Sequence, residues 1–396
     1  MDAVFGADAA ALTAAANERT AHPSLRILFC VWNYYPLPTG GAERQAQLQA
    51  EELVRRGHSV CVICPDAEGA TSGVVNGVSV RRLRHLRGVP GHKLTYLVSL
   101  IWFFVRYGLR YDVVHVHVAN LQADAIVLLA RALRRPSLVK VASGGSTGEV
   151  RTRAASAWWT RRLSLRKPTR VQALSDEIYA ELREIGVEPE RIVSIPNGLD
   201  LKRFRPPSAS ERDRARTKLG LPRNGVICLF AGRFAHDKGL LELLAAWRAI
   251  DQADALLVLA GSYDTPNAIP PIGASSSIKV MPFTHDMPEL MRAADIFVYP
   301  SHADGMSNAV LEALASGLCV VASTSGATAQ IVRDRESGLL IEPGDGIALK
   351  ACLETVLRDE QKRAAMGAAG HRAASNFGIG RVVDQIEDVY RIICAT

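Results

Sequence analysis

Short apolar runs that alternate with helical stretches, in two successive series, constrain the fold of this chain more than any other feature. In the first series, the runs predict strands at 26–31, 60–64, 78–83, 113–117, 138–141, 170–173 and 192–195. Helical spacing between them predicts helices at 42–56, 95–107, 123–133 and 176–185. Strands that alternate with helices indicate a largely parallel sheet covered on both faces.

The series stops at a proline-rich, highly charged stretch, residues 200–224, and then starts again. We place a domain boundary near Arg205, and 396 residues are enough for about two domains. The second series predicts strands at 226–231, 255–260, 278–281, 296–299, 319–322 and 339–341. It predicts helices at 240–250, 287–294, 308–316 and 381–394. The fold class is therefore α/β with two tandem units.

The two ends of the chain receive separate predictions. Residues 1–25 are Ala-rich without a basic start or a compact apolar core, so we expect a mobile tail rather than a secretory signal. The domains are expected at 26–205 and 206–378. The last segment, 379–396, is expected to form a helix whose single apolar face packs against another element. No apolar run approaches the ~18 residues of a membrane span, and we expect a cytoplasmic protein.

Composition excludes several classes. An apolar fraction of 48% with 22% charged residues is typical of a folded domain rather than a disordered chain. The seven cysteines lack CxxC or CxxH spacing, so we expect no metal site. Five of them lie in apolar strand-like runs and are predicted to be small buried side chains in a reducing compartment: Cys30, Cys61, Cys64, Cys228 and Cys319.

Charge is unevenly spread along the chain. Residues 1–205 carry 28 Lys and Arg against 18 Asp and Glu, whereas residues 206–396 carry 19 against 22. This asymmetry predicts that the first half meets something anionic. Because no zinc-finger, helix-turn-helix or aromatic RNA-binding motif accompanies the charge, we expect no nucleic acid as a partner. An anionic membrane surface and a phosphate-bearing acceptor both remain open.

A loop at 231–239 follows a strand and precedes a helix. Gly232 is expected to let the backbone turn, and Asp237 to cap the helix. Arg233 and Lys238 flank the positive end of that helix. Two cations at a helix N-terminus suit a diphosphate, and a loop with two solvated basic residues is the alternative.

A second loop leads from the strand at 296–299 into the helix at 308–316. It contains Asp304 and Gly305, with Glu312 eight positions after Asp304. The backbone amides of Met306, Ser307 and Asn308 begin the helix and offer a second place for an anion. Apolar neighbours flank Glu312, so its carboxylate needs partners, which sugar hydroxyls or nearby backbone amides would provide.

Two features of the first half complete the candidate site. Gly40 and Gly41 precede a helix and would allow close approach of a ligand from the facing domain, although turn formation explains them equally well. His117 ends a predicted strand. A histidine at this position is either a residue that contacts the acceptor or a purely structural residue.

Taken together, these motifs resemble a known family. The sequences GGAER at 40–44, DVVHVH at 112–117 and IPNGLD at 195–200 carry the resemblance in the first half. Gly232 to Gly239, Pro300 to Ala313 and SGL at 337–339 carry it in the second. The chain resembles a GT-B glycosyltransferase of the family 4 type, which is retaining and uses nucleotide sugars, over nearly all of residues 26–393.

The resemblance implies a fold and a set of roles. Two Rossmann-like domains face each other, and the last helix crosses back to the first domain. Arg233 and Lys238 bind the donor diphosphate, Glu312 holds the ribose, Asp304 faces the donor sugar, and the amides of Met306 to Asn308 contact sugar or phosphate. The implied donor is a UDP- or GDP-sugar, and no cofactor or metal is required. The acceptor would be a hydroxyl compound. The basic charge of the first domain, rather than the resemblance, is the reason to expect an anionic or lipid-linked acceptor and peripheral membrane contact.

Three positions differ from the usual family pattern. Asp304 replaces the usual Glu, Gln330 stands where a loop Glu is common, and Ala142 begins a segment where many members have His. Two alternatives to a transferase therefore stay open. One is a non-catalytic partner subunit that binds a nucleotide sugar. The other is an epimerase or phosphorylase on the same scaffold.

Overall fold

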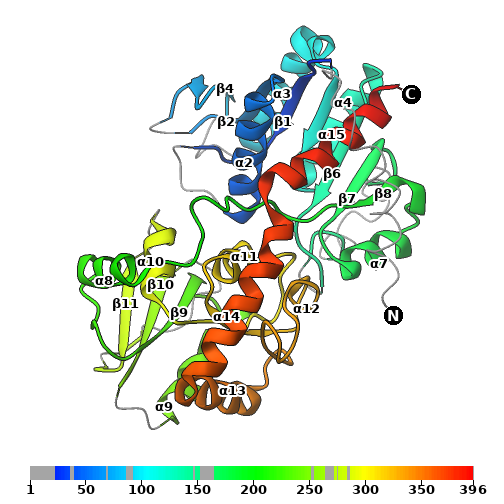
Figure 1. Cartoon of the computed structure of the whole chain (residues 1–396). Coiled ribbons are helices and arrows are strands. Elements are labelled where there is room, and N and C mark those ends of the chain that lie inside the picture. Colours follow the sequence, from blue (N-terminus) through cyan, green and yellow to red (C-terminus); the bar gives the residue numbers. More distant parts are fainter. Residues whose placement is uncertain are drawn as a thin grey trace.

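The described residues fold into two α/β domains, one above the other in Figure 1. The computed structural model describes residues 23–35, 40–67, 70–85, 92–145, 148–151, 165–250, 254–263, 272–273, 275–282 and 286–395. Most of the tail predicted at 1–25 lies outside these residues.

The first domain is built on a sheet with strand order β3-β4-β2-β1-β5-β6-β7-β8 in the described part of the chain. Every neighbouring pair is parallel except β3 and β4. The strands are β1 (Arg26–Cys30), β2 (Ser59–Pro65), β3 (Gly73–Val75), β4 (Val78–Leu83), β5 (Val113–Val116), β6 (Ser137–Val141), β7 (Arg170–Ala173) and β8 (Ile192–Ser194). The predicted parallel sheet is confirmed.

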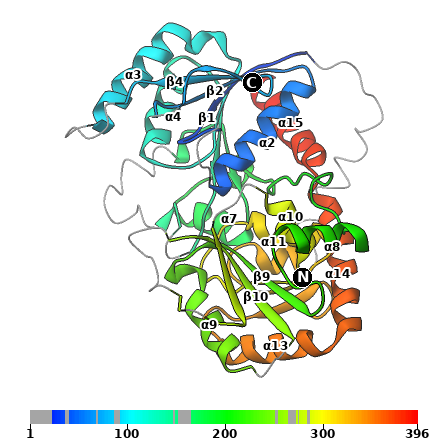
Figure 2. The ribbon, with the colours of Figure 1, turned by 90° about the vertical axis from the view of Figure 1, so that its left-hand side faces the viewer.

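Helices cover both faces of this sheet, which is what the apolar runs require. They are α2 (Gly41–Arg55), α3 (His92–Tyr107), α4 (Leu121–Ala132), α7 (Asp176–Glu184) and the short turns η1 (Gly108–Arg110) and η2 (Pro189–Arg191). Side chains of α3 and α4 pack in one apolar cluster, and those of α2 in another on the opposite face. Figure 2 shows α2 and α3 on different sides of the strands.

The second domain has a sheet with strand order β11-β10-β9-β12-β13-β14 among the described residues, parallel throughout. Its strands are β9 (Val226–Arg233), β10 (Ala255–Ser262), β11 (Ile278–Pro282), β12 (Ile296–Tyr299), β13 (Cys319–Ser323) and β14 (Gly338–Ile341). Its helices are α8 (Ala209–Lys218), α9 (Leu240–Arg248), α10 (Met287–Ala293), α11 (Asn308–Ala315), α12 (Thr328–Ile331), α13 (Gly346–Arg358) and α14 (Glu360–Ala374), with the turns η3 (His236–Lys238) and η4 (Ser375–Phe377).

One helix forms where the sequence indicated only a charged connection. α8 begins with a capping box, in which Ser208 and Glu211 each accept a hydrogen bond from the other's backbone N–H. Its buried side includes Arg216, whose guanidinium donates to the Asp295 carboxylate at 2.7 Å. Because an ion pair rather than an apolar stripe fixes α8, hydrophobic periodicity could not find it.

The last helix, α15 (Ile379–Ala395), returns to the first domain, as predicted. Its apolar side packs with α2 and β1 in one cluster, and it contributes Val382, Val383, Ile386, Val389, Tyr390 and Ile393. The Tyr390 hydroxyl lies 2.6 Å from Nδ1 of His115 on β5, and Arg56 at the end of α2 donates to Glu387 at 2.6 Å. The helix therefore fastens the end of the chain to the first sheet.

Candidate active site

The two domains meet at the carboxyl ends of their strands, which is where open parallel sheets bind ligands. Ser143, just after β6, pairs with Gly305, in the loop after β12, through a backbone bridge. A Cβ on Gly305 would lie 1.9 Å from the carbonyl oxygen of Ala142, so only glycine fits at this contact. The loop predicted to bind the sugar therefore lies directly against the first domain.

A charged cluster, which we call the Lys238 cluster, lies at the ends of β9 and β12. It consists of Lys238, Asp304 and Tyr299. The Tyr299 hydroxyl donates to Oδ2 of Asp304 at 2.6 Å, and Nζ of Lys238 is 3.4 Å from the same oxygen. Nζ also lies 5.7 Å from the centre of the Tyr299 ring. The structure thus brings together two of the three residues predicted to be catalytic.

Electrostatics keep Lys238 charged although only 12% of its side chain is exposed. Burial alone would lower the pKa of Lys238, but Tyr299, Asp304 and Asp237 more than offset this, and the pKa is raised. A lysine that stays protonated in a partly dehydrated site can bind a diphosphate there.

Arg233 lies at the end of β9 with an exposed side chain. It donates to Oδ2 of Asp237 at 3.1 Å, and Nζ of Lys238 is 3.8 Å from that atom. The prediction that Asp237 caps the next helix is wrong, because α9 begins after Gly239 with no side-chain cap. Asp237 pairs with the two cations instead.

The predicted turn at Gly232 is also wrong, since β9 continues through that residue to Arg233. The chain turns at Gly239, whose φ is +64° and whose Cβ position would lie 1.9 Å from the carbonyl oxygen of Pro300. Gly232 itself remains in the strand that leads into the site. The left-handed backbone conformation of Gly239 places Lys238 next to the start of α9.

The helix α11 faces the first domain through Asn308. Its amide donates to the carbonyl oxygen of Gly41 at 3.0 Å, and its Oδ1 accepts from Asn197 at 2.9 Å and Gln45 at 3.1 Å. A Cβ on Gly41 would lie 3.1 Å from the Asn308 amide nitrogen. Gly40, the residue before α2, keeps extended backbone. Gly41 thus allows close approach of the facing domain itself, whereas the atom nearest to a Cβ on Gly40 belongs to Glu43 of α2.

Met306 and Ser307 are both buried at the start of α11. The Asn197 side chain donates to the Met306 carbonyl oxygen at 3.0 Å, and Ser307 caps the helix by accepting from the Val310 amide at 3.4 Å. The backbone amides at the start of α11, which the sequence predicts to bind an anion, therefore lie at the contact between the two domains.

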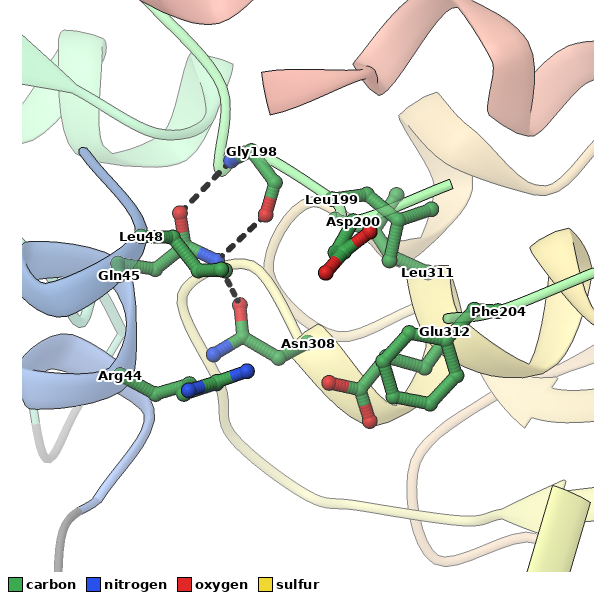
Figure 3. Close-up of a pocket in the computed structure, with 10 residues that line it drawn as sticks. All are labelled: Arg44, Gln45, Leu48, Gly198, Leu199, Asp200, Phe204, Asn308, Leu311 and Glu312. Atoms are coloured by element: carbon green, nitrogen blue, oxygen red, sulfur yellow. Dashed lines mark hydrogen bonds between the residues drawn. The ribbon is translucent and has the colours of Figure 1, made fainter. Parts of the chain in front are cut away.

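Glu312 faces a pocket between the domains, with Arg44 on the opposite side (Figure 3). Burial raises the pKa of Glu312 to about 7, against the opposing effects of Arg44 and Arg203. The pocket is lined by Arg44, Gln45, Leu48, Gly198, Leu199, Asp200, Phe204, Asn308, Leu311 and Glu312. A carboxyl group that titrates near neutrality in a pocket is typical of a functional site.

Two predicted residues stand apart from this arrangement. Gln330 is exposed on α12, although Gly326, four residues earlier, packs against Asp304 and Gly305. His117 is fully buried, and neither ring nitrogen has a hydrogen-bond partner among the residues described. Burial, His115 and Lys140 lower the pKa of His117 well below its usual value. Its contact with an acceptor stays a prediction and would require the ring to be uncovered.

Sequence reasoning missed buried polar residues of the first domain that support its side of the domain contact, where Gln45 and Asn197 both donate to Asn308. Gln45 exchanges hydrogen bonds of 2.7 Å with both backbone groups of Gly198. Lys140 is fully buried on β6, and its Nζ donates to Oδ1 of Asn197 at 2.7 Å. Burial lowers the pKa of Lys140 to about 7, although Glu149 raises it in part. A lysine inside an apolar strand pattern was the one available indication.

Comparison with known proteins agrees with this geometry. The family model "Glycosyl transferase 4-like domain" matches residues 40–198, and "Glycosyl transferases group 1" matches residues 225–359. The chain belongs to the GT-B glycosyltransferases of the family 4 type.

Among curated relatives, a D-inositol 3-phosphate glycosyltransferase of Xylanimonas cellulosilytica is 31% identical over 240 residues, which are 56% of this chain and 58% of the relative. The chain thus spans little more than half of that protein. An Escherichia coli UDP-Gal:alpha-D-GlcNAc-diphosphoundecaprenol alpha-1,3-galactosyltransferase is 26% identical over 71% of this chain and 75% of the relative.

Solved structures share the fold at low identity. Anabaena Alr3699/HepE in complex with UDP and glucose matches with a TM-score of 0.76 and 20% identity, covering 93% of this chain and 99% of that one. WaaG, a glycosyltransferase involved in lipopolysaccharide biosynthesis, matches with a TM-score of 0.73 and 19% identity, covering 92% and 99%. These matches confirm two facing Rossmann-like domains.

Proposed function

We propose that the protein transfers a hexose-type sugar from a nucleotide-diphosphate donor to a hydroxyl acceptor, with retention at the anomeric carbon. The Lys238 cluster carries this proposal. Lys238, which is mostly shielded from solvent, lies after β9 and 3.4 Å from Asp304, and Asp304 is in the loop after β12 that contacts the facing domain. Fixed cations at such a position would stabilise the charge that develops on a departing diphosphate.

The donor is assigned by charge and by similarity. Lys238 and Arg233 would bind the diphosphate, and the α11 amides from Met306 to Asn308 would contact sugar or phosphate. Asp304 would face the sugar, and Glu312 would accept hydrogen bonds from ribose hydroxyls. A UDP-sugar is the first candidate and a GDP-sugar the second, because one solved neighbour holds UDP and a curated relative is named for UDP-Gal.

Transfer would not need a protein base. As the bond from the anomeric carbon to the phosphate oxygen breaks, the acceptor hydroxyl oxygen forms the new bond on the same face, and its proton passes to the released phosphate oxygen. The positive charges of Lys238 and Arg233 would stabilise the negative charge that develops on the departing diphosphate, so that a metal ion would not be required. His117 and the pair Gly40–Gly41 would lie on the acceptor side of the site.

The acceptor is proposed to be anionic or lipid-linked. The basic first half of the chain supports this, and so do relatives named for an inositol phosphate and for a diphosphoundecaprenol substrate. A cytoplasmic location with peripheral membrane contact would follow from such an acceptor.

The test is nucleotide release. Wild-type protein is incubated with UDP-, GDP- and ADP-sugars, with and without a panel of hydroxyl acceptors, and both nucleotide and sugar products are analysed. Acceptor-dependent release of nucleotide is expected from at least one donor. Tight donor binding without any release would assign the chain to a binding subunit. Isomerised donor without acceptor would indicate an epimerase.

A further inference from the structure

The helix α3 carries apolar side chains on two opposite faces. One face is buried in the first domain and includes Tyr96, Leu100, Phe103 and Phe104. The opposite face forms what we call the exposed α3 row: Leu94, Val98, Ile101, Trp102 and Val105, whose exposed fractions are 63%, 59%, 41%, 60% and 74%. Their spacing places them along a single stripe of the helix. A contiguous apolar stripe in water marks an interaction surface.

A cluster of arginines adjoins the end of this row. The guanidinium carbons of Arg81, Arg106 and Arg110 lie 5.5, 5.2 and 5.0 Å from the centre of the Tyr107 ring. That ring contacts Trp102, with ring centres 5.8 Å apart. We call this group the Tyr107 arginine cluster. In the part of the chain that the structure describes, none of its three arginines forms an ion pair.

Three like charges around one ring repel one another unless anions lie among them. Helix α3 itself has no Asp or Glu, so it supplies no counter-charge. The cluster and the exposed α3 row are therefore complementary to a surface that is apolar inside and anionic at its edge.

We infer that the exposed α3 row and the Tyr107 arginine cluster dock the protein on an anionic lipid bilayer. The arginines would contact lipid phosphates, and the apolar row would enter the boundary between headgroups and acyl chains. Trp102, between the two, suits this boundary. No described helix is long and apolar enough to cross a membrane. Both ribbon views place α3 at the end of the first domain that is remote from the second domain (Figures 1 and 2), so docking leaves the candidate site accessible.

A second copy of this chain fits this surface less well. Pairing through the same face would bring two basic surfaces together, which is unfavourable. Lipid supplies both the missing negative charge and an apolar medium. This inference does not rest on the proposed transferase activity, since vesicle binding is measured without donor or acceptor.

The test is flotation of the full chain with phosphatidylcholine vesicles that contain or lack phosphatidylglycerol. Wild type is expected to float only with the anionic vesicles, and less so in high salt. Arg106→Gln and Arg110→Gln should each lower the partition coefficient roughly fivefold. The double variant Trp102→Ser/Val105→Ser should lose binding. Matched controls on the second domain are Ile347→Ser, at a side chain 87% exposed, and the exposed Arg358→Gln.

Three results would overturn the inference. They are equal, negligible flotation with both vesicle types, flotation of the α3 variants at the wild-type level, and a dimer in light scattering that the α3 variants abolish. Circular dichroism and thermal melting of each variant keep a folding defect from being taken for lost binding.

Discussion

Each domain holds a lysine that is shielded from solvent near the domain contact, fully in Lys140 and mostly in Lys238, yet the pKa values of the two shift in opposite directions. In the second domain, Lys238 has Asp304 at 3.4 Å, and its pKa is raised. In the first, Lys140 donates to the neutral amide of Asn197, and burial lowers its pKa to about 7. The difference teaches that burial lowers the pKa of both lysines, and that Tyr299, Asp304 and Asp237 outweigh it at Lys238 whereas Glu149 offsets it only in part at Lys140. This contrast supports the proposal that the donor diphosphate binds in the second domain rather than in the first.

Replacing Asp304 by Asn should have the largest effect on activity. Asparagine keeps the shape of the side chain and still accepts from Tyr299, but the negative charge beside the proposed sugar site disappears. We expect turnover to fall about 100-fold, with a smaller change in donor affinity. Steady-state kinetics of nucleotide release give both values. The control is Asp213→Asn, at an exposed position. Wild-type turnover in Asp304→Asn would mean that the Asp304 carboxylate takes no part in the reaction.

The precise position of Lys238 should depend on its neighbour Gly239. Alanine there combines a φ of +64° with a clash against Pro300, whereas Gly344 has a φ of +84° and open space around it. Gly344→Ala should lose about 1 kcal/mol of stability and Gly239→Ala roughly 2–4 kcal/mol. Denaturant unfolding measures the difference. Equal losses would mean that the close approach to Pro300 contributes nothing.

Lys140→Met should change how stability depends on pH. The unfolded lysine has a pKa near 10.5 and the native one about 7, so the native protein binds fewer protons between these values. Wild type therefore gains stability as pH rises from about 7 to 10.5, and the methionine variant lacks this gain. From pH 7 to 9 the difference should amount to about 2 kcal/mol. Melting curves that stay parallel over this range would contradict a buried, partly neutral lysine.

The smallest expected effect comes from Glu312→Gln, in the pocket between the domains. Its native pKa of about 7 exceeds the ordinary 4.5, so the native state retains a proton that the unfolded chain loses. Stability from this group is present below about pH 4.5 and declines as pH rises to about 7. Wild type should lose about 2–3 kcal/mol across this window relative to the variant, whereas Lys140 should contribute about 4 kcal/mol from pH 7 to 10.5. Thermal unfolding from pH 5 to 8 tests this, and identical pH profiles would refute it.

Much of the fold was predictable because buried strands of parallel sheets are short apolar runs. The strands predicted at 170–173 and 296–299 have these bounds in the structure. Helix α14 was missed because its packing relies on glycine rather than on an apolar stripe. A Cβ on Gly367 would lie 2.1 Å from the carbonyl oxygen of Gly317. Such close backbone contacts leave no periodic pattern in a sequence.

Only the part of the candidate site that belongs to the second domain was predictable from the sequence. Lys238 and Asp304 are charged loop residues next to strand ends, a pattern that the sequence displays directly. The contacts of Asn308 with Gly41 and Gln45 join residues more than 260 positions apart. No local pattern encodes a hydrogen bond across two domains, so only the structure reveals which residues hold the domains together.

Binding of a nucleoside diphosphate to the two lysine variants tests the central contrast most directly. Titration calorimetry with UDP and GDP would compare wild type, Lys238→Met and Lys140→Met, with Lys350→Met as a surface control. For the diphosphate that wild type binds, Lys238→Met should weaken affinity roughly 10- to 150-fold, the loss expected for hydrogen bonds to a charged group. Lys140→Met and Lys350→Met should stay within about twofold of wild type. Unchanged affinity in Lys238→Met, or an equal loss in Lys140→Met, would contradict the assignment of the diphosphate to the second domain.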